Sequence, residues 1–70
     1  MNKEITFIVH EAEEGGYYAE SAGVAIFAEG ETINTLKNNI KSGIECYFES
    51  KDELPTLVHL HYVKDEVFSL

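Results

Sequence analysis

The chain has one cysteine, one proline, no tryptophan and only five basic residues among seventy. A single cysteine excludes an intramolecular disulfide framework. No apolar run approaches the roughly 20 residues of a membrane span, and no charged segment followed by an apolar one precedes the first β-like pattern. These absences predict a cytoplasmic protein made of one small domain.

The shortage of basic residues makes the chain strongly acidic. Thirteen Asp and Glu residues against five Lys and Arg give a formal net charge of -8. Nucleic acids and anionic membranes repel such a charge, so we expect no direct binding of DNA, RNA or membrane. A cationic protein would be attracted to it. The same charge also serves solubility alone, and composition does not decide between these two roles.

Common catalytic patterns are missing as well. The chain contains no Ser/His/Asp or Cys/His arrangement, no Cys-x-x-Cys pair and no phosphate-binding loop. Cys46 has no basic neighbour that would make its thiol reactive, and we expect it to be buried or half-buried. We therefore expect a protein that is not an enzyme and uses no cofactor.

The first part of the chain predicts a β-meander. Ile5, Phe7 and Val9 alternate with more polar residues, as the buried side of a strand does. The paired glycines of Glu13-Glu14-Gly15-Gly16 can adopt the positive φ that a tight hairpin turn requires. The three predicted strands cover residues 3–11, 17–21 and 24–28.

A helix and a fourth strand follow. Thr32, after Gly30-Glu31, is a plausible N-cap, and the helix should end near residues 48–50. Gly43 weakens such a helix by about 1 kcal/mol relative to alanine, which suggests a close approach to the sheet there. The fourth strand is predicted at residues 56–63. The apolar stripe of the helix consists of Ile33, Leu36, Ile40, Ile44 and Tyr47.

This element order predicts an α+β fold, β-β-β-α-β, over residues 1–70. Sequential hairpins place the second strand between the first and third, and the helical crossover returns the fourth strand parallel to the first. The sheet is therefore mostly antiparallel, with strand order 3-2-1-4 and one helix packed on one face. The opposite face lacks a helix, and we expect it to contact another molecule.

A set of residues at fixed spacing is typical of one family of small prokaryotic domains. These residues are Glu14-Gly15-Gly16-Tyr17, Ala19-Glu20, Ile26, Gly30-Glu31-Thr32, Asn39 and Tyr47. On these residues the chain resembles the HicB-type antitoxin domain, over roughly residues 4 to 50. It departs from the family at Ala28-Glu29, where Thr-Gln is usual, and it has the shorter of the family's loops at residues 21–25.

The resemblance implies a partial RNase H-like fold and a function in a toxin-antitoxin system. Longer members of the family also carry a DNA-binding domain, and we expect no separate domain of that kind in residues 1–70. A HicB-type antitoxin binds and occludes a HicA-like toxin, which is a small basic ribonuclease that cuts mRNA. Complementary charge would speed the encounter. The candidate partner-binding residues are Glu11, Glu13, Glu14, Tyr18, His59 and His61.

Two other functions stay open. The chain could be a self-associating domain that forms a homodimer or a higher homo-oligomer through its open sheet face or an edge strand. It could also be a small metal-binding protein, because His59 and His61 lie two residues apart on one strand and His10 lies on a neighbouring one. Histidines on a half-exposed sheet face or at a subunit contact are the more ordinary interpretation, so we expect no metal site.

Overall fold

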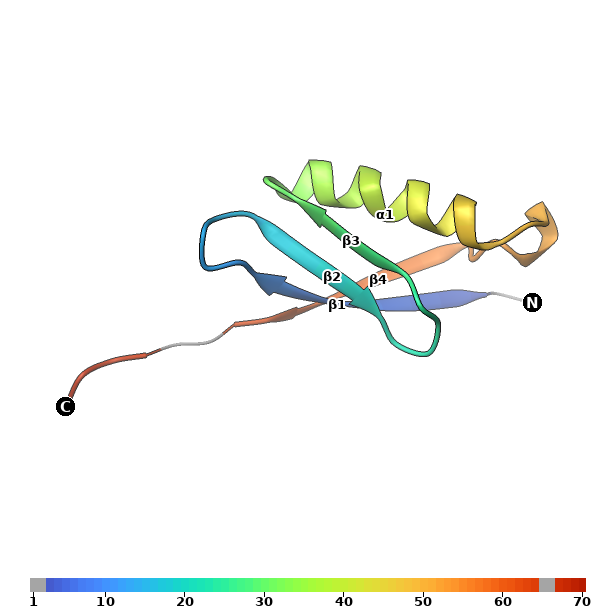
Figure 1. Ribbon diagram of the computed structural model, residues 1–70. Helices are drawn as coiled ribbons and strands as arrows, with labels where there is room; N and C mark the ends of the chain where they lie inside the picture. The colour runs from blue at the N-terminus through green and yellow to red at the C-terminus, as the bar shows by residue number, and fades with distance from the viewer. Residues whose placement is uncertain (1–2, 65–66) are drawn as a thin grey trace.

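The computed structural model describes residues 3–64 and 67–70 and contains a four-stranded sheet with one long helix (Figure 1). In the sheet, β1 pairs with β2 and β2 with β3 in antiparallel fashion, while β4 runs parallel to β1, in the order β3-β2-β1-β4. The predicted α+β fold and strand order are confirmed. The elements are β1 (Glu4–Glu11), β2 (Tyr17–Ser21), β3 (Phe27–Gly30), α1 (Ile33–Tyr47), a single 3-10 turn (Lys51–Glu53) and β4 (Leu57–Val63).

The core lies between the sheet and α1. The predicted alternation in β1 holds, since Ile5, Phe7 and Val9 are all buried under the helix. Burying one such side chain contributes about 1.5–3 kcal/mol, so a few residues supply most of the stability of so small a domain. The buried hydrophobic residues are Ile5, Phe7, Val9, Ala19, Ile26, Ala28, Leu36, Ile40 and Ile44.

The start of α1 is capped as predicted. The Thr32 hydroxyl oxygen accepts a hydrogen bond from the backbone N–H of Thr35 at 3.1 Å, and the backbone of Thr32 is extended. This bond satisfies one of the N–H groups that the first turn of a helix leaves without an intrahelical partner.

Loss of the cap should weaken the fold. We expect Thr32→Ala to lower the free energy of unfolding by about 1 kcal/mol, because an orphan N–H is exposed at the first turn. Thr32→Ser keeps the accepting oxygen and should retain most of the stability. Urea unfolding followed by circular dichroism measures both variants, and equal losses for alanine and serine would contradict a capping role.

The end of α1 differs from the prediction in one respect. Tyr47 was expected on the buried stripe, but its side chain is 47% exposed, while Phe48 packs against the core. The buried residues of the stripe recur every four positions through Ile44, so the next position on that face is Phe48. Cys46, expected to be at least half-buried, lies on the exposed side of the last turn.

β3 begins three residues later than predicted. The predicted strand covered residues 24–28, but the sequence before Phe27 forms a loop held by local hydrogen bonds. The Ser21 hydroxyl donates to the Val24 carbonyl, and the Ile26 N–H donates to the same oxygen. The apolar pattern resembled a strand because Ile26 still points into the core from this loop.

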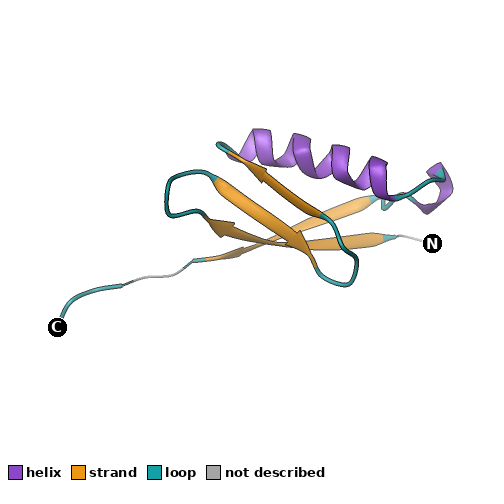
Figure 2. Cartoon of the chain, viewed as in Figure 1, coloured by secondary structure: helices purple, strands orange, loops and turns teal. Residues whose placement is uncertain are grey.

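The two edges of the sheet are sheltered unequally. Figures 1 and 2 show α1 running along the β3 side of the sheet, where it contacts β3 and β2. β4 forms the opposite edge, and Leu60 alone among its residues is partly buried. None of the helices within residues 3–64 and 67–70 has the length and apolarity that crossing a bilayer requires.

Candidate protein-binding site

The sheet face opposite α1 has no helix over it in the described part of the chain. Successive side chains of a strand alternate between faces, so the registers determine which residues lie there. We call this surface the open face. Its residues are Glu4, Thr6, Ile8, His10, Tyr18, Glu20, Phe27, Glu29, Leu57, His59, His61 and Val63.

Three aromatic rings form a row across the open face. His10 of β1 stands opposite Tyr18 of β2, and the rings stack with centroids 4.9 Å apart and an interplanar angle of 13°. Phe27 lies diagonally across on β3, with its centroid 6.1 Å from that of Tyr18. Phe27 is 62% exposed, an unusual state for a phenylalanine on a regular strand. We call these three residues the aromatic row.

Carboxylates flank the aromatic row on both sides. Glu20 lies opposite Phe27, and its Oε1 is 3.9 Å from His10 Nε2. Glu29 lies opposite Tyr18 on β3. Glu20 and Glu29 are both exposed, so their charges are available to another molecule.

The β1–β2 hairpin adds more negative charge at one end of the row. Gly15 and Gly16 both have positive φ, at 102° and 83°, which confirms the turn predicted from the paired glycines. The turn is closed by the Ala12 N–H, which donates to the Gly16 carbonyl at 3.0 Å. An acidic hollow lies beside this turn, and its lining includes His10, Tyr18, Glu11, Glu13, Glu14 and Glu29.

The aromatic row and the carboxylates around it together form a surface that suits a cationic side chain. Guanidinium and ammonium groups bind over aromatic rings, at about 0.5–1 kcal/mol per exposed contact, and they form charge-assisted hydrogen bonds with carboxylates. Tyrosine and phenylalanine are also enriched in protein interfaces. The open face near the aromatic row can therefore receive arginine or lysine side chains of a second protein.

The predicted candidate residues separate into two groups. Glu11, Glu13, Glu14 and Tyr18 come together around the acidic hollow, as a shared contact surface requires. His59 and His61 lie on β4, away from the hairpin, and neither lines the hollow.

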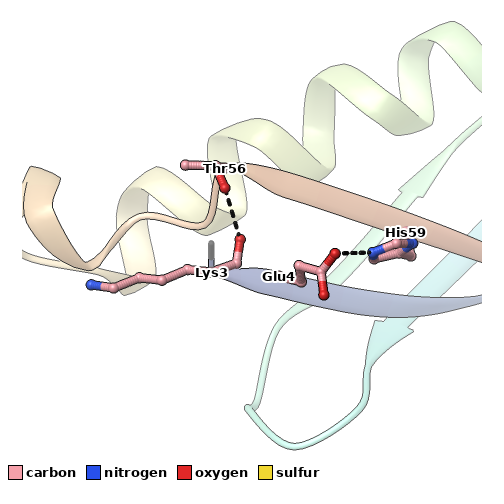
Figure 3. A network of polar contacts seen from close by, with 4 residues as sticks. All are labelled: Lys3, Glu4, Thr56 and His59. Carbon is pink, nitrogen blue, oxygen red and sulfur yellow. Dashed lines mark hydrogen bonds and ion pairs between the residues drawn. The ribbon is translucent and has the colours of Figure 1, made fainter. Parts of the chain in front are cut away.

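The three histidines share the open face, but each has a different neighbour. His10 stacks on Tyr18, while His61 stands opposite Ile8. His59 Nε2 lies 3.1 Å from Glu4 Oε1, near the start of the β1–β4 pairing (Figure 3). Among residues 3–64 and 67–70, no group of three or more His, Cys, Asp or Glu side chains is placed to hold a metal ion.

Sequence reasoning missed three contributors to this surface, namely Glu20, Phe27 and Glu29. Alternation along the third strand was the available signal, because it places Phe27 and Glu29 on the same side. The predicted end of that strand at residue 28 left Glu29 out. Glu20 belongs to the family motif, and its position beside the aromatic row depends on the register between β1, β2 and β3.

Several motif residues that carry the family resemblance stabilise the fold. The Asn39 side-chain amide donates to the Glu29 carbonyl at 2.6 Å and so ties α1 to β3. A Cβ on Gly30 would lie 2.6 Å from the backbone nitrogen of Leu36, so only glycine permits this approach of the helix. These residues hold the sheet and helix together.

Two curated proteins are similar to this chain over most of its length. A UPF0150 protein of Thermotoga maritima is 40% identical over 63 residues, which cover 90% of this chain and 87% of the relative. A UPF0150 protein of Archaeoglobus fulgidus is 36% identical over 53 residues, covering 76% and 77% respectively. Neither name states an activity or a partner. No family model matches the chain, and no solved structure matches it significantly.

Proposed function

The chain belongs to the UPF0150 protein family, and from this premise we propose that it is a binding protein of the HicB antitoxin type. Its partner would be a small basic mRNA-cleaving toxin of the HicA type. The observation that carries the proposal is the aromatic row flanked by Glu20 and Glu29 on the open face. The motif resemblance over residues 4 to 50 supports the same assignment.

The proposed mechanism is occlusion. A ribonuclease surface that binds RNA phosphates is cationic, and the carboxylates of the open face and hairpin would occupy it in place of those phosphates. Opposite net charges would accelerate the encounter, because this chain carries -8. Tyr18 and Phe27 would exclude water at the centre of the contact and so slow dissociation. The chain would act by binding alone and would perform no catalysis of its own.

Binding to a toxin of this kind provides the direct test. We expect the protein to co-purify with a basic HicA-type toxin encoded beside its gene and to restore growth of cells that express that toxin. Failure of both experiments with such a toxin would overturn the proposal for that pair. Isothermal titration calorimetry then gives the dissociation constant for comparing variants.

A pair of charge reversals locates the surface. Each Glu→Lys replacement adds two charges, so Glu20→Lys with Glu29→Lys raises the net charge by 2 + 2 = 4, from -8 to -4. We expect this double variant to bind at least about tenfold more weakly, a loss of about 1.4 kcal/mol, because it places cations beside the aromatic row. The weakening should be largest at low salt, where charges are least screened.

The matched control is Glu49→Lys with Glu53→Lys. These two exposed residues lie after α1 and outside the open face, and their reversal changes the net charge by the same amount. We expect the control to change the dissociation constant by less than about threefold. Equal weakening by the two double variants would show that net charge alone matters, and would remove the open face as the specific site.

A further inference from the structure

β4 is an edge strand without the usual protection against pairing. Proteins commonly place charges, prolines or bulges on such strands, which otherwise offer free backbone N–H and C=O groups to another strand. β4 has the sequence Leu57-Val58-His59-Leu60-His61-Tyr62-Val63, with no proline and no Asp, Glu, Lys or Arg. All of its residues except Leu60 are exposed.

Both faces of β4 carry apolar side chains. On the helix side, Val58, Leu60 and Tyr62 form one wall of a groove of about 650 Å³, whose other wall includes Ile40 and Ile44 of α1. On the open face, Leu57 and Val63 are also exposed. A partner that covers only one face would leave the other apolar set in water. Pairing along the edge covers part of both.

The charge pattern favours a second copy of this chain as the partner that pairs with β4. Residues 54–63 form the longest run of the sequence without Asp, Glu, Lys or Arg. Two molecules that each carry -8 repel one another, so they approach best along a strand that has no carboxylate of its own. The carboxylates beside β4 are Glu4, 3.1 Å from His59, and Glu45, which lines the groove together with Lys37 and Lys41. A basic partner would gain nothing from an uncharged strand and is better served by the acidic hollow.

The backbone of β4 determines how two copies can align. The Leu57 N–H donates to the Lys3 carbonyl at 3.3 Å, so the backbone N–H and C=O groups of the odd-numbered residues of β4 point toward β1. Because successive residues of a strand direct these groups to opposite edges, those of Val58, Leu60 and Tyr62 point outward. The middle one, Leu60, is therefore the natural centre of an antiparallel pairing.

An alignment centred on Leu60 is self-complementary on both faces. Leu60 meets Leu60 of the second copy, and Val58 meets Tyr62 of the second copy, so the groove wall pairs apolar with apolar. On the open face, Leu57 meets Val63 of the second copy, and His59 meets His61. Cross-strand pairs of this kind contribute about 0.2–1 kcal/mol each. The two-fold axis passes through the Leu60 pair, which occurs once, and makes every other pair occur twice.

We propose that two copies of this protein form a dimer by antiparallel pairing of their β4 strands about Leu60. The result is a continuous eight-stranded sheet with both α1 helices on one face. The two grooves between α1 and β4 face each other across the axis, so Val58, Leu60 and Tyr62 of both copies form one apolar strip. The aromatic rows stay outside the interface, so the dimer does not depend on the proposed toxin partner.

The oligomeric state tests the interface first. We expect the wild-type chain to sediment as a dimer at micromolar concentration, and Tyr62→Lys to raise the dimer dissociation constant at least about 100-fold, because each dimer gains two lysines in the apolar strip. Phe27→Lys is the matched control, since Phe27 is 62% and Tyr62 53% exposed, on opposite edges of the sheet. The control should change the constant by less than threefold. A monomeric wild type, or equal effects of the two substitutions, would overturn the proposal.

Disulfide trapping tests the register independently of any loss of stability. In a Cys46→Ser background, which removes the exposed native thiol, a tagged His59→Cys variant is mixed with an untagged His61→Cys variant and the mixture is oxidised. Opposite residues in such a pairing have Cα atoms about 4.5–5.5 Å apart, within the range of disulfides. We expect a covalent heterodimer of one tagged and one untagged chain. Mixing His59→Cys with Val63→Cys, which is offset by two residues, should give far less, and equal yields would overturn the register.

Discussion

Replacing Gly30 with alanine is expected to remove most of the free energy of unfolding of this domain. A Cβ at this position would lie 2.6 Å from the backbone nitrogen and 2.9 Å from the Cα of Leu36, in the first turns of α1. Backbone atoms of a packed helix cannot move aside without shifting the helix from the sheet. Overpacking of this kind costs about 3 kcal/mol, while a core this small supplies only about 3–5 kcal/mol. Circular dichroism and chemical unfolding measure the loss.

Gly43→Ala provides the matched control for Gly30→Ala. The added Cβ would again lie between α1 and the rest of the domain, but it would meet only the Ile26 side-chain methyl Cγ2, at 3.1 Å. That side chain can move by a few tenths of an ångström, and alanine gains about 1 kcal/mol over glycine within a helix. We expect Gly43→Ala to be neutral or stabilising. A comparable loss from both substitutions would show that the close approach at Gly30 is not the cause.

Phe7→Ala is expected to have an effect of similar size for a different reason. Phe7 is fully buried in the middle of β1, beneath α1, and it is one of the largest buried side chains of the domain. Truncating a buried phenylalanine costs about 3–5 kcal/mol, from lost apolar burial and from the cavity left behind. We expect the variant to lose cooperative unfolding or to melt below room temperature.

Phe27→Ala is the control that shows whether the loss of stability in Phe7→Ala comes from the burial of the phenylalanine or from the residue type alone. Phe27 is exposed on the open face, so Phe27→Ala should change the free energy of unfolding by less than about 1 kcal/mol. The two variants must be compared at one protein concentration, because a dimer makes the apparent stability depend on concentration. If Phe27→Ala destabilised the fold as much as Phe7→Ala, the aromatic row would be a structural element and a poor candidate for partner contacts.

Most elements of the fold could be predicted because their signals are local. The alternation of Ile5, Phe7 and Val9, the paired glycines of the hairpin and the cap at Thr32 each depend on a few neighbouring residues. The third strand was misplaced because an apolar pattern does not require a strand. Residues 24–26 form a loop held by hydrogen bonds to the Val24 carbonyl, and Ile26 reaches the core from this loop.

The candidate site was only partly predictable. The acidic hairpin and Tyr18 were identified from sequence. Carboxylates in a hairpin turn are expected to be exposed, and alternation along the strand directs one of the two successive tyrosines away from the core. The stacking of His10, Tyr18 and Phe27 was not, because it depends on the register between three strands. The groove beside β4 was missed for a related reason, since it depends on where α1 lies across the sheet.

The amino-acid sequence by itself determined the elements, their order, the buried face of each strand and the negative charge, because these follow from patterns over a few residues. The tertiary structure alone decided which edge of the sheet stays uncovered. Small residues, Ala19, Ala28 and Gly30, let α1 settle closely over β2 and β3, and Asn39 ties it there through the Glu29 carbonyl. With the helix held on that side, β4 is left exposed on both faces.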